Sequence, residues 1–199
     1  MNVMAATAST MLELGTTLPP FRLRDLNGKV VTSNDFEHTK GVLVAFICPH
    51  CPYVRHIRAE FARQARDWQQ RGVAVLAINS NDMAAFPDDS PEGMRQEVEE
   101  VGYTFPYFHD DTQDVAKAFR AACTPDFFLF DGRRRLVYRG QFDDSRPTSQ
   151  VPVTGKDLKA AVEALLSGRP ISRASTAAFK SFPVTGTWLF GRLSSNWPR

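Results

Sequence analysis

Cysteine is scarce in this sequence, with three residues, Cys48, Cys51 and Cys123, among 199. Three cysteines are too few for a disulfide-stapled scaffold, so apolar packing has to hold the fold together. Charges of one sign form no long block, and the formal net charge is only +2. This balance argues against a nucleic-acid partner and against an anionic membrane surface.

Long apolar runs are also lacking. We find no segment long enough to span a bilayer, and the N-terminus lacks the charged region and apolar stretch of a signal peptide. These absences predict a cytoplasmic protein that makes no use of a membrane. A hydrophobic content of 43% over 199 residues fits one ordinary domain with extensions. In a reducing compartment, a Cys-x-x-Cys pair is more often catalytic or metal-binding than structural.

An unbroken apolar run from Val42 to Ile47 leads directly to Cys48 and Cys51. Because the run is apolar at every position, it predicts a central strand covered on both faces, with a helix beginning after the cysteines. Two thiols at such a junction can close a disulfide over a tight turn, and the helix N-terminus favours a thiolate at the first of them. This arrangement fits redox chemistry or metal binding.

The remaining segments predict an α/β domain. Turn residues at 27–28 and 131–132 predict a β-hairpin over 21–31 and an antiparallel hairpin over 127–138. Apolar periodicity predicts helices at 54–72, 90–101, 111–122 and 156–167, and further strands at 73–78 and 104–108. The step from the central strand through a helix to the strand at 73–78 predicts a right-handed parallel crossover.

Three motifs, together with this order of elements, resemble a known family. The motifs are Phe46–Val54 (FICPHCPYV), Cys123–Asp131 (CTPDFFLFD) and Tyr138–Ser145 (YRGQFDDS). The chain is similar to thioredoxin-fold proteins of the redoxin, or AhpC/TSA-like, group of thiol-disulfide oxidoreductases. The resemblance implies a mixed central sheet, finished by the antiparallel hairpin, flanked by helices and preceded by the N-terminal hairpin.

The resemblance covers residues 16–167 and implies three segments. They are an N-terminal leader over 1–15, a thioredoxin-like domain over 16–167 and a C-terminal extension over 168–199. The aromatic residues of the extension are predicted to cover an apolar surface patch, and they are Phe179, Phe182, Trp188, Phe190 and Trp197. The oligomeric state is left open.

The resemblance also implies a role for each residue of the first motif. Cys48 is expected to be the exposed nucleophile, and Cys51 is expected to resolve the mixed disulfide. Only a thiolate attacks, so the pKa of Cys48 is expected to be low. Pro49 and His50 tune the site, His50 by its charge beside Cys48. The Cys48–Cys51 disulfide is then the only redox group, with no added cofactor and no metal.

The second motif contributes Thr124 and Pro125, which occupy the place where the family carries a cis-proline facing the dithiol. The backbone before such a proline is free to pair with an extended substrate, so the expected partners are protein or small-molecule thiols and disulfides. Pro125 also weighs against a bound metal. Cys123 is a third thiol near this point, with burial as its expected fate. Asp143 and Asp144 are expected to be solvated turn carboxylates.

The chain departs from the family at several positions. Val42 stands where thioredoxin carries a buried aspartate that accepts a proton, and Ile47 stands where a tryptophan is usual. Gly41 and Ala45 replace the proline and threonine of the peroxide-reducing branch. The segment Thr185–Arg199 has no further cysteine, although relatives tend to end with one.

Two alternatives to disulfide exchange stay open. One is a thiol-dependent peroxidase that uses Cys48 with Cys51 or Cys123 as the resolving thiol. The other is a metal-binding or metallochaperone module in which Cys48 and Cys51, with Cys123 or a histidine, are soft ligands.

Overall fold

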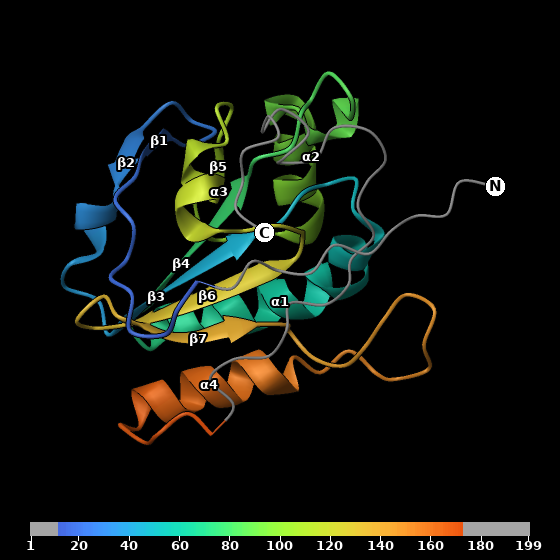
Figure 1. The fold of residues 1–199 in the computed structure, drawn as a ribbon. Helices are drawn as coiled ribbons and strands as arrows, with labels where there is room; N and C mark the ends of the chain where they lie inside the picture. Colours follow the sequence, from blue (N-terminus) through green and yellow to red (C-terminus); the bar gives the residue numbers. More distant parts are fainter. Residues whose placement is uncertain (1–11, 173–199) are drawn as a thin grey trace, which may run out of the picture.

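The computed structural model describes residues 12–172, which contain all the helices and strands named here (Figure 1). In chain order, the elements are β1 (Arg22–Arg24), β2 (Val30–Thr32), η1 (Ser33–Phe36), β3 (Gly41–Phe46), α1 (Pro52–Gln70), β4 (Val73–Asn79), η2 (Pro87–Asp89), α2 (Pro91–Val101), β5 (Tyr107–His109), α3 (Asp114–Phe119), β6 (Asp126–Asp131), β7 (Leu136–Gly140) and α4 (Lys156–Leu166). The predicted aromatic patch of the C-terminal extension falls on residues 173–199, outside this described part.

A five-stranded sheet with the order β5-β4-β3-β6-β7 forms the centre of the domain. Strand β3 pairs in parallel with β4, and β4 pairs in parallel with β5. Strands β6 and β7 are antiparallel to their neighbours and form the second hairpin. Strands β1 and β2 form a separate antiparallel hairpin. The predicted mixed sheet, with its two hairpins, is confirmed.

Strand β3 is buried on both faces, as its apolar run predicts. Leu43 and Ala45 pack into one core cluster with the apolar faces of α1 and α4, whereas Val44 and Phe46 pack into a second cluster with α3. This division follows from the two-residue period of a strand. Figure 1 shows α1 and α4 on one side of the sheet, and α3 with the β1–β2 hairpin on the other.

Two helices begin where the sequence places their start signals. Pro52 is the first residue of α1, where a missing N–H costs nothing. The side chain of Ser90 caps α2 by accepting a hydrogen bond from the N–H of Gly93 at 3.3 Å, and the helix ends at Gly102 in the left-handed conformation. Among the described residues, no helix has the length and apolar character that crossing a bilayer requires.

Helix α3 and strand β5 are shorter than predicted. Asp110 accepts hydrogen bonds from the N–H groups of Val115 and Ala116, at 3.4 and 2.9 Å, so the helix begins after a loop held by that side chain. The helix ends at Arg120, which is in the left-handed conformation. Both limits depend on tertiary and turn geometry rather than on periodicity.

Candidate active site

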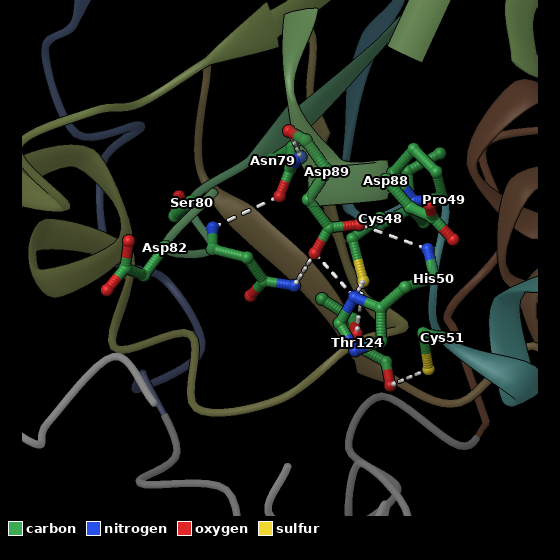
Figure 2. Close-up of polar contacts among 12 residues, drawn as sticks. Cys48, Pro49, His50, Cys51, Asn79, Ser80, Asp82, Asp88, Asp89 and Thr124 are labelled. Carbon is green, nitrogen blue, oxygen red and sulfur yellow. Dashed lines mark hydrogen bonds and ion pairs between the residues drawn. The ribbon is translucent and has the colours of Figure 1, made fainter. Parts of the chain in front are cut away.

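Figure 2 shows Cys48 and Cys51 between the carboxyl end of β3 and the first turn of α1. Both thiols are free, and both contact Thr124, which lies more than seventy residues further along the chain. The Cys48 Sγ lies 3.3 Å from the Thr124 Oγ1, and the Cys51 thiol donates to the Thr124 carbonyl at 3.4 Å. The Thr124–Pro125 peptide bond is cis. The structure therefore brings the first two motifs together around one dithiol.

The exposure expected for Cys48 is wrong, because its side chain is fully buried. Burial raises the pKa of the Cys48 thiol well above its usual value, and the neighbouring Cys51 and the charge of Asp89 raise it further. The low pKa expected for Cys48 is therefore also wrong. Cys48 holds its proton strongly in this conformation.

The helix N-terminus acts on the second cysteine instead of the first. Because α1 begins at Pro52, Cys51 is its N-cap residue. A hydrogen bond from Cys48 lowers the pKa of Cys51 to about 6, against the opposing effect of burial, and the backbone N–H groups of Tyr53 and Val54 contribute to the lowering.

His50 is held against a buried carboxylate that the sequence analysis did not identify. The backbone N–H of His50 donates to the Asp89 Oδ1 at 3.0 Å, and the His50 Nδ1 lies 2.5 Å from the Asp89 Oδ2 (Figure 2). The same ring nitrogen lies 3.6 Å from the Cys48 Sγ. The ring stacks on that of Phe86, with 4.2 Å between centroids and 9° between planes. His50 is thus fixed at one edge and on one face.

Asp89 is the last residue of the short helix η2, and it accepts hydrogen bonds from side chains at the end of β4 and just after it. The Asn81 Nδ2 donates to the Asp89 Oδ2 at 2.7 Å, and the Asn79 Nδ2 donates to the Asp89 carbonyl at 2.8 Å. A signal for this cluster exists in the sequence, since polar residues 79–82 follow the buried strand next to β3. Side chains beyond the carboxyl ends of adjacent parallel strands tend to meet in one crevice.

Arg55 connects η2 to the cysteine motif. Its Nε donates to the Pro49 carbonyl at 2.7 Å, and its guanidinium lies 3.1 Å from the Asp88 carboxylate. Pro49 thus contributes its carbonyl to the frame of the site. The Arg55–Asp88 pair is half exposed, so its contribution to stability is small.

Residues of the third motif line one pocket together with Pro125, and Asp143 holds this segment in place through hydrogen bonds. The prediction that Asp143 is solvated is wrong, because the residue is 2% exposed. Its carboxylate accepts from the N–H groups of Thr154 and Gly155, both at 2.6 Å, and from that of Ser145 at 2.8 Å. Burial alone would raise the pKa of Asp143, but these hydrogen bonds together lower it. The lining of this pocket also includes Tyr53.

Cys123 is buried, as predicted. Gly41 and Ala45, which replace the residues of the peroxide-reducing branch, both lie inside β3. A Cβ at Gly41 would lie 2.8 Å from the Phe130 carbonyl and 2.6 Å from the Leu165 side chain, so this strand has no room for a larger residue there. The packing of the sheet therefore excludes the larger residue of the peroxidase branch at Gly41.

Among the described residues, the groups able to ligate a metal together are Cys48, His50 and Asp89, whose ligand atoms lie within 4.8 Å of one another. Two ligands of one tetrahedral zinc ion, each about 2.0–2.1 Å from it, lie roughly 3.3 Å apart. The 2.5 Å between His50 and Asp89 is instead a hydrogen-bond distance. In this arrangement, the two side chains bind each other.

The AhpC/TSA family model matches residues 14–139. The chain is 30% identical over 132 residues to the thiol-disulfide oxidoreductase ResA of Geobacillus kaustophilus (strain HTA426), covering 63% of this chain and 67% of that protein. A hypothetical protein from Sinorhizobium meliloti 1021 has a solved structure that is 46% identical, with a TM-score of 0.82, covering 90% of this chain and 100% of that one.

A thioredoxin domain of a thiol-disulfide oxidoreductase from Bacteroides vulgatus is 22% identical, with a TM-score of 0.57. The match covers 67% of this chain and 92% of that domain. At this identity the likeness concerns the fold alone. It establishes that the domain is thioredoxin-like, in agreement with the mixed sheet and flanking helices described above.

Proposed function

The chain belongs to the AhpC/TSA family, and we propose that it is a thiol-disulfide oxidoreductase that works through Cys48 and Cys51. The observation that carries this proposal is the convergence of both sulfurs on Thr124, at 3.3 and 3.4 Å. A substrate backbone that pairs beside Thr124 and Pro125 has its disulfide next to the dithiol. The relationship to ResA, named a thiol-disulfide oxidoreductase, supports the same reaction.

In the proposed reaction, the Cys48 sulfur attacks one sulfur of the partner's disulfide. The partner's S–S bond breaks, its second sulfur leaves as a thiolate, and a mixed disulfide forms at Cys48. Cys51 then attacks the Cys48 sulfur, closes the Cys48–Cys51 disulfide and releases the other thiol. Two electrons pass to the partner, and the reverse sequence oxidises a dithiol. Because both sulfurs are buried, the partner has access only after local movement.

Substitution of single cysteines tests this proposal. We expect Cys48→Ser to abolish reduction of a protein disulfide by dithiothreitol through this enzyme, since the attacking sulfur is lost. Cys51→Ser should instead accumulate mixed disulfides at position 48, detectable by mass spectrometry. Cys123→Ser is the matched control, because it removes a buried thiol outside the proposed pair and should leave turnover close to the wild-type rate. Full turnover by either active-site variant contradicts the mechanism.

The proposal includes no added cofactor, and its partners are protein or small-molecule thiols and disulfides. We also retain the cytoplasm as the proposed location, since a dithiol of this kind is maintained as free thiols in a reducing compartment. The peroxidase alternative predicts rapid, saturating peroxide consumption, whereas disulfide exchange predicts none. The metal-binding alternative predicts stoichiometric zinc or copper after anaerobic purification.

A further inference from the structure

The His50–Asp89 pair lies directly beside Cys48 and has no part in the exchange steps given above. Asp89 is fully buried, and its two oxygens face three N–H donors or ring nitrogens, from the His50 backbone, the His50 ring and the Asn81 amide. A buried carboxylate so surrounded is an acceptor, so the hydrogen-bond network assigns the ring proton of His50 to Nδ1. The other ring nitrogen, Nε2, is buried with no partner among residues 12–172.

Cys48 and Asp89 both face the same ring nitrogen. The His50 Nδ1 lies 3.6 Å from the Cys48 Sγ and 2.5 Å from the Asp89 Oδ2. Because Nδ1 carries the ring proton, it is a donor and has no lone pair for the Cys48 proton, so the acceptor in this cluster is the Asp89 carboxylate. The stacked ring of Phe86 holds the imidazole in the orientation that fixes this carboxylate.

Formation of a thiolate at Cys48 without proton uptake nearby would be costly. The sulfur is buried and lies within 4.8 Å of a carboxylate oxygen of Asp89, so a second negative charge there meets strong repulsion. If the proton of Cys48 moves into the cluster, the pocket keeps a single negative charge. That charge then leaves with the partner's thiolate.

We propose that Asp89 keeps Cys48 protonated at rest and takes up its proton during attack, and that His50 is the positioning residue that holds the carboxylate beside the sulfur. This inference rests on the proposed exchange reaction. The Cys48 S–H bond breaks and its proton goes to the Asp89 carboxylate, while His50 keeps its own proton on Nδ1. The sulfur electron pair forms the bond to the partner's sulfur as the partner's S–S bond breaks. When the partner leaves, the proton returns to solvent or to the released thiolate.

Other titratable or charged groups lie around the cluster of Cys48, His50 and Asp89, on each neighbouring element. They are Cys51 of the motif, Arg55 of α1, Asp88 of η2, Glu97 of α2 and Tyr107 of β5. Glu97 titrates near neutral pH because burial raises its pKa to about 7. A pH profile of the thiols therefore needs a Glu97→Gln background, in which this titration is absent.

The test is Asp89→Asn, measured in two ways in a background that lacks Cys123 and carries Glu97→Gln. First, the pH profile of alkylation at Cys48, followed by mass spectrometry, should move to lower pH by roughly 1 to 3 units, because a repelling charge is gone. Second, the turnover of a protein disulfide should fall on the order of 100-fold, because the proton acceptor is gone. Because unfolding would also return the pKa of a buried thiol toward its usual value, both readouts are taken on variant protein that a urea-unfolding transition shows to be folded.

Asp88→Asn is the matched control, since Asp88 lies next in sequence on η2 but is exposed and pairs with Arg55 instead of His50. It should change neither readout by more than about twofold. An unchanged alkylation profile in Asp89→Asn overturns the electrostatic half of the proposal, and undiminished turnover overturns the proton-uptake half. Absence of turnover in the wild type would instead count against the proposed function, while the alkylation result still stands.

A measurement on the wild-type protein decides the matter if Asp89→Asn does not fold. The nitrogen-15 chemical shifts of the His50 ring report which nitrogen carries the proton. The proposal predicts a protonated Nδ1 and an unprotonated Nε2 in the reduced protein. A ring protonated only at Nε2 overturns it, because the free Nδ1, and not Asp89, would then be the acceptor beside Cys48.

Discussion

Two of the buried aspartates of the domain differ in their partners. Asp143, which lines a pocket together with Pro125, accepts hydrogen bonds from backbone N–H groups and from the Ser145 hydroxyl, none of which titrates near neutral pH. Asp89 accepts from a histidine ring that also faces a cysteine. Both carboxylates are almost fully buried. Burial therefore does not distinguish a carboxylate with a structural role from the one proposed to take part in the chemistry. The distinguishing feature is a neighbouring group that can exchange a proton.

The largest effect expected on stability is that of Asp143→Asn. The amide places an NH₂ group where a carboxylate oxygen accepts short hydrogen bonds from Thr154 and Gly155. We expect the free energy of unfolding in urea to fall by about 3 kcal/mol, the cost of charged hydrogen bonds left unpaired in the interior.

The same variant also sharpens the comparison between the two aspartates. The pKa of Asp143 is lowered in the folded protein, so its contribution to stability is present above the unfolded-state pKa and is lost as the pH falls through the folded-state value. Asp143→Asn should remove this acid-dependent part. It should leave the alkylation profile of Cys48 unchanged in the folded fraction. A shifted profile would mean that the two aspartates are not distinct in role.

A smaller effect is expected from Glu97→Gln. Glu97 is 3% exposed and lies 3.5 Å from the Tyr107 hydroxyl, and burial raises its pKa to about 7. Between its usual pKa and this value, the folded protein binds more protons than the unfolded chain, so stability falls as the pH rises. We expect the wild type to be about 1 to 3 kcal/mol less stable at pH 8 than at pH 5 from this group.

Glu97→Gln should flatten this dependence in urea unfolding measured at the two pH values. The relevant observation is the difference between pH 5 and pH 8, because the substitution itself changes the packing at both. An identical difference in the variant and the wild type would show that Glu97 does not titrate in this window. It would also remove the need for the Glu97→Gln background in the thiol measurements.

Periodicity and turn residues were sufficient to predict most of the fold. The apolar run before Cys48 predicts the buried strand β3, and the Asn27–Gly28 and Asp131–Gly132 turns predict both hairpins. The ends of α3 were missed because Asp110 and Arg120 set them through loop geometry. The match of short motifs to a family also predicted the meeting of the dithiol with Thr124 and Pro125, which no local pattern could have given.

The sequence was less informative about electrostatics in the site. The sequence pattern predicts an effect of the helix N-terminus on Cys48, but α1 begins at Pro52 and makes Cys51 its N-cap. Asp89 lies thirty-nine residues from His50 in sequence and reaches it only through the crossover to β4. Its role depends on a tertiary contact, so neither composition nor periodicity could assign it. The burial of Asp143 was missed for the same reason.

The most direct test of disulfide exchange is a redox titration of the full-length protein in glutathione buffers, with the thiol state read by mass after trapping. We predict one two-electron transition that joins Cys48 to Cys51. This transition should persist in Cys123→Ser and vanish in both Cys48→Ser and Cys51→Ser. A wild-type protein that shows no such transition, or whose transition requires Cys123, would contradict the account.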